Sequence, residues 1–156
     1  MYVHLTNNRT PLTNVFSKAI PSIVQTTLTL LNKPPATPAL KLAALDVMVT
    51  VVFYNPSLAL HTLESMPGGS RTFFDKWFGA AASEAGLPRV HDKKLSILTL
   101  CELLKLDPSV VPPSLRDGWN GLVGGILSIF KTLPDAQART YHISWLVEFW
   151  FINLSL

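Results

Sequence analysis

Apolar residues recur every three or four positions through most of this chain, and prolines and glycines separate the segments that carry this pattern. Such spacing is typical of helices that bury one face. It predicts about six helices between residues 11 and 134, joined by short links rich in proline. Thr37-Pro38 and Asn55-Pro56 each place a capping side chain before a proline, which marks a helix start.

The predicted helices need one another to bury their apolar surface. The helix expected to end at Tyr54 is apolar nearly all round, so it should be buried on every side. Pro21 should kink or split the first helix, and Pro134-Asp135 should end the last. Short links make consecutive helices antiparallel. The sequence therefore predicts an all-α fold, an α-solenoid of antiparallel helical pairs of the HEAT or armadillo type.

Composition agrees with a chain that buries much of its surface. Hydrophobic residues make up 48 % of it and charged residues 15 %, against roughly 25 % charged in average domains. Some apolar surface should therefore need a neighbour, which could be a partner protein, a membrane or more of the same chain. The net charge is +3, but the basic residues are scattered, which argues against nucleic-acid binding. A single cysteine, Cys101, favours a reducing compartment.

Two apolar stretches raise the possibility of a membrane protein. Residues 39 to 54 are interrupted by Lys41 and Asp46, and residues 143 to 156 by Glu148. Both are shorter than the ~20 apolar residues that a spanning helix needs. We expect no membrane insertion, and a membrane-associated helical protein stays as an alternative. The N-terminus lacks the basic and apolar segments of a signal peptide.

The chemistry with most promise lies in RVHDKKLSILTLCELLKL, residues 89 to 106. An adjacent His-Asp pair such as His91 and Asp92 can hold a metal when further ligands are present. An alternative function is therefore a small metal-dependent enzyme, similar to a phosphohydrolase, that uses these two residues and perhaps His61.

Most of the pattern argues against catalysis. The other histidines, His4, His61 and His142, belong to no HExxH motif and to no second His-Asp pair. A cysteine nucleophile needs a base close by, but Cys101 lies ten positions past His91, which is about 15 Å along a helix. His91 therefore cannot activate Cys101 within one helix. We therefore expect no catalytic, cofactor-binding or metal-binding residue and no cofactor.

A structural helix explains the same segment more simply. Asp92 would lie in its first turn, where a carboxylate favours the helix dipole. Leu98 and Leu100 are expected to be buried, and Lys93 and Lys94 should remain at a solvated end. The competing interpretation is a protein-binding ridge, and its candidate residues are Arg89, Asp92, Lys93 and Lys94.

Several segments together resemble a known family. VVFYNPSLALHTLE (51–64), FFDKWF (73–78) and RVHDKKLSILTLCELLKLD (89–107) are similar to the C-terminal HEAT repeats of importin-β-type nuclear transport receptors. The branch is that of importins seven and eight and their fungal relatives. NVFSKAIPSIVQTTLTLL (14–31) and LRDGWNGLVGGILSIFKTL (115–133) fit the helices before and after.

The resemblance implies a carrier rather than a catalyst. Such receptors bind protein cargo and Ran GTPase mainly on inner helices, and nucleoporins mainly on outer ones. Cargo in this branch is often basic, such as ribosomal proteins or histones. The segment from Asp92 to Leu106 would be an inner helix. The expected location is the nucleus, the cytoplasm and the nuclear envelope with its pores.

The chain departs from the family pattern at both ends, so we expect a fragment. It lacks the N-terminal repeats that carry the principal Ran contact and the acidic stretch that follows in this branch. Residues 1–10 should be frayed or disordered, 11–134 should form the HEAT-like repeats, and 135–156 match nothing in the family. An end repeat exposes an apolar face, so self-association or marginal stability is expected.

Overall fold

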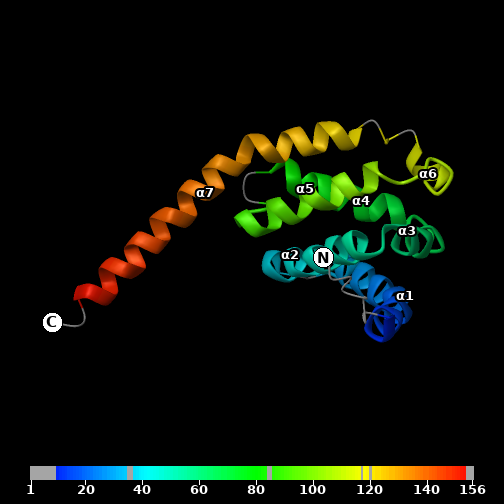
Figure 1. Cartoon of the computed structure of the whole chain (residues 1–156), viewed down its shortest axis with the longest axis horizontal. Coiled ribbons are helices and arrows are strands. Elements are labelled where there is room, and N and C mark those ends of the chain that lie inside the picture. The colour runs from blue at the N-terminus through cyan, green and yellow to red at the C-terminus, as the bar shows by residue number, and fades with distance from the viewer. Residues whose placement is uncertain (1–9, 35–36, 84–85, 117, 120, 154–156) are drawn as a thin grey trace, which may run out of the picture.

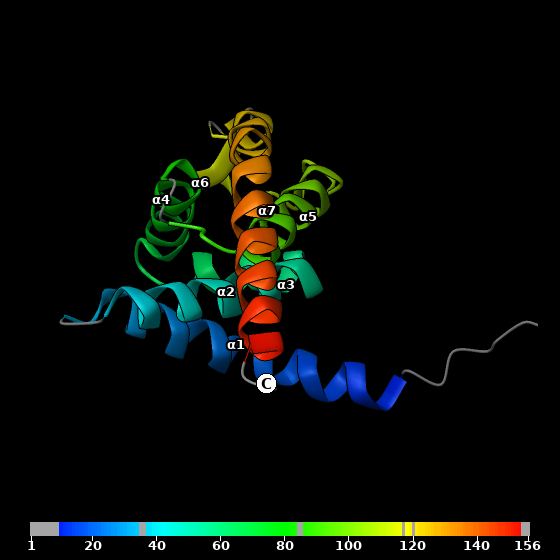
Figure 2. The ribbon, with the colours of Figure 1, turned by 90° about the vertical axis from the view of Figure 1, so that its left-hand side faces the viewer.

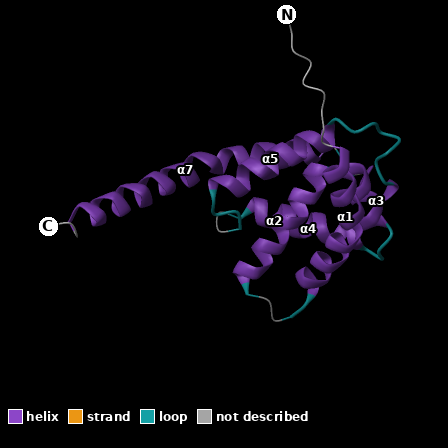
Figure 3. Ribbon diagram, turned by 60° about the horizontal axis from the view of Figure 1, so that its bottom comes forward, coloured by secondary structure: helices purple, strands orange, loops and turns teal. Residues whose placement is uncertain are grey.

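The computed structural model describes residues 10–34, 37–83, 86–116, 118–119 and 121–153, which contain helices and turns but no strand (Figures 1 and 3). The helices are α1 (Thr10–Asn32), α2 (Pro38–Tyr54), α3 (Pro56–Glu64), α4 (Gly69–Ala82), α5 (Val90–Leu104), α6 (Pro113–Arg116) and α7 (Gly121–Asn153). The all-α prediction is confirmed. Because the short α6 was not expected, the described residues form seven helices where about six were predicted.

Two helix starts follow the predicted local signal. The side chain of Thr37 accepts a hydrogen bond from the backbone N–H of Leu40 at 3.2 Å, and Pro38 occupies the first turn of α2. Asn55 does the same for α3, where its Oδ1 accepts from the N–H of Leu58 at 3.2 Å. Each cap satisfies a donor that the first helical turn leaves without an intrahelical partner.

The helices lie in three tiers (Figures 1 and 2). α1, α2 and α3 form the lowest tier in Figure 1, α4 and α5 the middle one, and the first part of α7, drawn yellow to light orange, the upper one; the rest of α7 runs down and away from the stack. α5 packs against α2 on one side and against α7 on the other, and α4 also contacts α7. This arrangement agrees with a stack of helical pairs of the HEAT or armadillo kind.

Aromatic side chains of α4 join the middle tier together. Phe73 and Trp77 are fully buried and stack with ring centroids 5.3 Å apart. The indole Nε1–H of Trp77 donates to Ser96 Oγ of α5 at 3.0 Å. The buried ring thus has a partner for its polar atom, and these aromatic side chains pack α4 against its neighbours.

Two prolines lie inside helices rather than at their ends. α1 continues through Pro21 and α7 through Pro134, so the predicted helix end at Pro134-Asp135 is wrong. A proline inside a helix removes one backbone hydrogen bond and usually bends the helix. Ile129 and Ala136, on either side of Pro134, are both buried, so packing keeps α7 helical there. Figure 1 shows α7 changing direction along its length.

The two leucines expected in the core have different environments. Leu100 is fully buried, as predicted, whereas 53 % of Leu98 is exposed, so the prediction for Leu98 is wrong. Because α5 is covered by α2 and α7 on two sides, the strip that remains uncovered carries Leu98 together with exposed Lys94, four positions earlier.

Leu100→Ala and Leu98→Ala form a matched pair. We expect Leu100→Ala to lower the free energy of unfolding by ~2–5 kcal/mol, because it leaves a cavity in the core. Leu98→Ala should change it by less than about 0.5 kcal/mol. Urea titrations followed by circular dichroism measure both. Equal losses for the two variants would contradict the orientation of α5.

Candidate functional site

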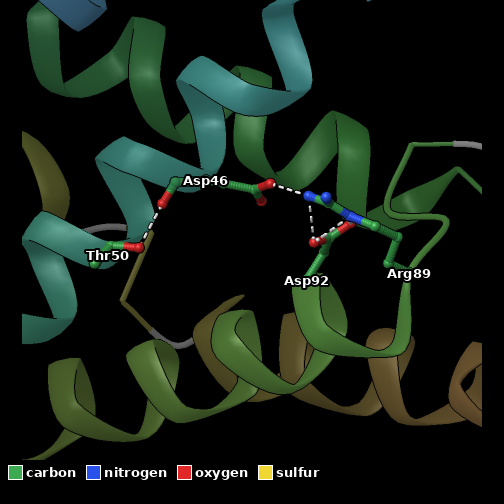
Figure 4. A network of polar contacts seen from close by, with 4 residues as sticks. All are labelled: Asp46, Thr50, Arg89 and Asp92. Atoms are coloured by element: carbon green, nitrogen blue, oxygen red, sulfur yellow. Dashed lines mark hydrogen bonds and ion pairs between the residues drawn. The ribbon is translucent and has the colours of Figure 1, made fainter. Parts of the chain in front are cut away.

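The candidate site lies at the start of α5, where Arg89 and Asp92 form a tight pair (Figure 4). The side chain of Asp92 is 0 % exposed, and that of Arg89 is 61 % exposed. Arg89 Nε lies 2.9 Å from each carboxylate oxygen of Asp92, and Arg89 Nη2 lies 2.8 Å from Oδ1. The guanidinium therefore neutralises a carboxylate that water does not reach.

The same guanidinium connects α5 to α2. Arg89 Nη2 lies 2.5 Å from Asp46 Oδ2, and the side chain of Asp46 is 21 % exposed. The hydroxyl of Thr50 donates to the backbone carbonyl of Asp46 at 2.7 Å, one turn further along α2 (Figure 4). One arginine thus bridges two carboxylates that belong to different tiers.

At Asp46, burial and the charge of Asp92 shift the carboxyl pKa in one direction and the nearby cations shift it in the other. Burial raises the pKa of its carboxyl, and the negative charge of Asp92 raises it further. Arg89 and His91 act against this rise. The hydrogen bonds and the charge of Asp92 raise the pKa of Arg89 above its usual value. Arg89 is therefore held in its charged form by the carboxylates it joins.

Lys93 points into the structure instead of into solvent. It is 0 % exposed, and its Nζ donates to Thr132 Oγ1 of α7 at 2.8 Å. The prediction of a solvated Lys93 is wrong, because α7 covers this side of α5. The sequence did hold a signal: Lys93 precedes Ser96, Ile97 and Leu100 at helical spacing, and these three are buried.

The four predicted interaction residues therefore separate into two pairs. Asp92 and Lys93 are internal and hold α5 to its neighbours. Arg89 and Lys94 are exposed and remain accessible to a partner.

Two observations concern the alternative functions, a metal-dependent enzyme and a membrane-associated helical protein. His91 is exposed at the start of α5, and His61 is exposed on α3, beside a cavity that Ser57 and Arg116 also line. Within the described ranges, no three side chains of His, Cys, Asp or Glu are grouped so that they could hold a metal ion. None of the helices in the described ranges combines the length and apolarity needed to span a membrane.

Comparison with known proteins finds relatives that match most of this chain. The chain is similar to importin-8. It is 32 % identical to importin-8 of Homo sapiens, and 29 % identical to those of Danio rerio and Mus musculus, each over 127 residues. The aligned region covers 78 % of this chain but 12 % of each relative. No family model matches the chain. No solved structure matches it either.

These similarities support the resemblance to importin-β-type receptors over most of the chain. The three relatives are vertebrate proteins, so the resemblance to the fungal members of the branch is not supported by them. The chain spans about one eighth of the length of the relatives it matches.

Lys93→Glu and Lys94→Glu make the same charge change at adjacent positions. Lys93→Glu should destabilise the fold by about 3–5 kcal/mol, because it puts a carboxylate in a buried site made for an ammonium group. Lys94→Glu should alter stability by less than about 0.5 kcal/mol. Thermal and urea unfolding of the two variants provide the measurement. A stable Lys93→Glu variant would show that α7 does not cover α5 as described.

Arg89→Met tests the bridge between α2 and α5. The variant keeps an apolar stem but leaves the buried Asp92 without its guanidinium, so we expect a loss of about 1–3 kcal/mol. Arg71→Met is the control, because Arg71 and Asp75 form an exposed pair and such pairs contribute at most about 1 kcal/mol. If both variants unfold at the same urea concentration as the parent chain, the bridge has no stabilising role.

Proposed function

We propose that this chain is a non-enzymatic, protein-binding segment of a nuclear import receptor. The observation that carries the proposal is the similarity to importin-8 over 78 % of the chain. The three tiers of helices support it, because stacked helical pairs provide extended surfaces for binding other proteins.

The proposed partners are protein cargo, Ran GTPase and nucleoporins, the last two within the full-length receptor. Basic proteins such as ribosomal proteins and histones are the proposed cargo. The chain would then contribute to Ran-dependent transport and be found in the nucleus, in the cytoplasm and at the nuclear envelope and pore. No cofactor, nucleic acid or membrane insertion is part of this proposal.

Arg89 and Lys94 are the proposed contact residues at the start of α5. Both are exposed, and both are positively charged. Arg89 is already engaged with Asp46 and Asp92, so Lys94 is the position at which charge can be changed with least effect on the fold. Long-range charge mainly alters the rate at which partners associate.

The proposal is tested with the purified chain and three probes. These are a core histone, Ran loaded with a GTP analogue or with GDP, and a nucleoporin peptide containing phenylalanine-glycine repeats. Biolayer interferometry should give saturable binding of the core histone to this chain, and any contact that the chain makes with Ran should depend on the nucleotide. If none of the three probes binds this chain more strongly than it binds an unrelated helical protein, the proposal is contradicted.

Lys94→Glu shows whether the start of α5 takes part. Its association rate should fall by about threefold or more for an acidic probe and rise for a basic one. Lys18→Glu makes the same charge change at an exposed position of α1 and is the matched control. Equal changes in both variants would place the contact elsewhere.

A further inference from the structure

A second surface of the molecule combines an apolar groove with unbalanced positive charge. The groove has a volume of about 550 Å³ and lies between the end of α1, the start of α2, the end of α4 and residues Gly86 and Pro88, which precede α5. This volume falls within the ~300–1,000 Å³ of typical ligand pockets. We call it the α2–α4 groove; its described lining consists of Leu31, Pro38, Ala39, Lys41, Leu42, Leu45, Lys76, Ala80, Gly86 and Pro88.

The base of the α2–α4 groove belongs to the folded core. Leu31 and Leu45 are buried and extend the core to this surface, while Leu42 and Ala80 are half-buried. On one side of the groove, the backbone of Gly86 packs directly against that of Ala80, so that a Cβ at position 86 would clash with the backbone carbonyl of Ala80. The groove is therefore formed by packed elements, and an apolar side chain can enter it without rearranging them.

Among the described residues that line the groove, the charged side chains have one sign. Lys41 and Lys76 are its only charged residues among those described, and both are exposed. Neither forms an ion pair with another described residue. The N-terminus of α2, capped by Thr37, adds the positive end of a helix dipole beside Pro38 and Ala39.

We propose that the α2–α4 groove binds a short peptide segment whose apolar side chains are flanked by carboxylates. Apolar side chains of the peptide would occupy the space above Leu42 and Leu45, and its carboxylates would face the ammonium groups of Lys41 and Lys76. A basic segment would meet two like charges at the rim and is disfavoured. This inference rests on the lining of the groove and does not depend on the proposed function.

The test uses the complete chain and a fluorescein-labelled peptide that alternates leucine with glutamate. Two matched peptides replace every glutamate with lysine or every leucine with serine. Fluorescence anisotropy should show saturable binding of the first peptide only, and its affinity should fall as salt is raised. Saturable binding of the lysine peptide with similar affinity would overturn the charge argument, and that of the serine peptide would overturn the role of the apolar base. Absence of saturable binding by the first peptide would overturn the proposal.

Two variants locate the binding site. Lys41→Glu combined with Lys76→Glu should weaken binding of the leucine–glutamate peptide by about tenfold or more. Lys18→Glu combined with Lys131→Glu makes the same charge change at exposed positions outside the groove lining and should retain binding to within about twofold. Equal weakening by both double variants would show that the peptide responds only to net charge.

Ala39→Trp fills the groove without changing its charge. Ala39 is exposed in the first turn of α2, so the variant should fold as the parent chain does, which circular dichroism checks. It should weaken peptide binding by about tenfold or more. Unchanged peptide affinity in a folded variant would overturn the proposal. Sedimentation of the parent chain as a dimer that Ala39→Trp converts to a monomer would also overturn it, since the occupant would then be a second copy.

Discussion

The packing of α5 between α2 and α7 is the constraint on which the rest of the structure depends. A helix covered on two sides must also bury the polar side chains that fall on those sides, and α5 buries Asp92, Lys93, Ser96 and Thr99. In the described part of the chain, no buried side-chain nitrogen or oxygen is left without a hydrogen-bond partner. The middle tier is thus held by polar contacts as well as by apolar area.

These polar contacts fix how α5 is placed against its neighbours. Asp92 is joined through Arg89 to Asp46 of α2, Lys93 to Thr132 of α7, and Ser96 to Trp77 of α4. Apolar faces alone allow helices to shift by a turn at small cost, because leucine and isoleucine side chains fit several neighbours. A buried charge has few alternative partners, so a shift would leave it unpaired at a cost of several kcal/mol. The contacts of Asp92 and Lys93 therefore specify the register of adjacent tiers, and the bond between Ser96 and Trp77 sets that of α5 against α4 within the middle tier.

Local features of the structure could be predicted from the sequence, whereas features set by neighbouring helices could not. Thr37 and Asn55 cap the helices that they were expected to cap, because a cap depends only on residues within three positions. Pro134 was expected to end a helix, and Leu98 to be buried, yet packing between helices decides both positions. Helical spacing places Lys93 on the buried side of α5. Lysine usually lies in water, however, and this preference led to the wrong prediction.

The same reasoning explains why the accessible part of the candidate site is small. Successive residues of a helix point about 100° apart, so Lys93 and Lys94 belong to different sides of α5 although they are adjacent in sequence. α7 covers one of these sides and leaves the other open, which makes Lys93 internal and Lys94 a surface cation.

The outer face of α7 carries an apolar stripe that no described helix covers. Val123, Leu127 and Phe130 recur at i, i+4 and i+7, and each is at least 50 % exposed. Leu122 and Ile129, on the other side of the same helix, are buried towards the lower tiers. Apolar stripes at helical spacing are what the lower tiers bury against one another, so this stripe has the pattern of a contact face. The expectation of self-association stays a prediction, and this stripe of three side chains is one surface on which a second copy can pack.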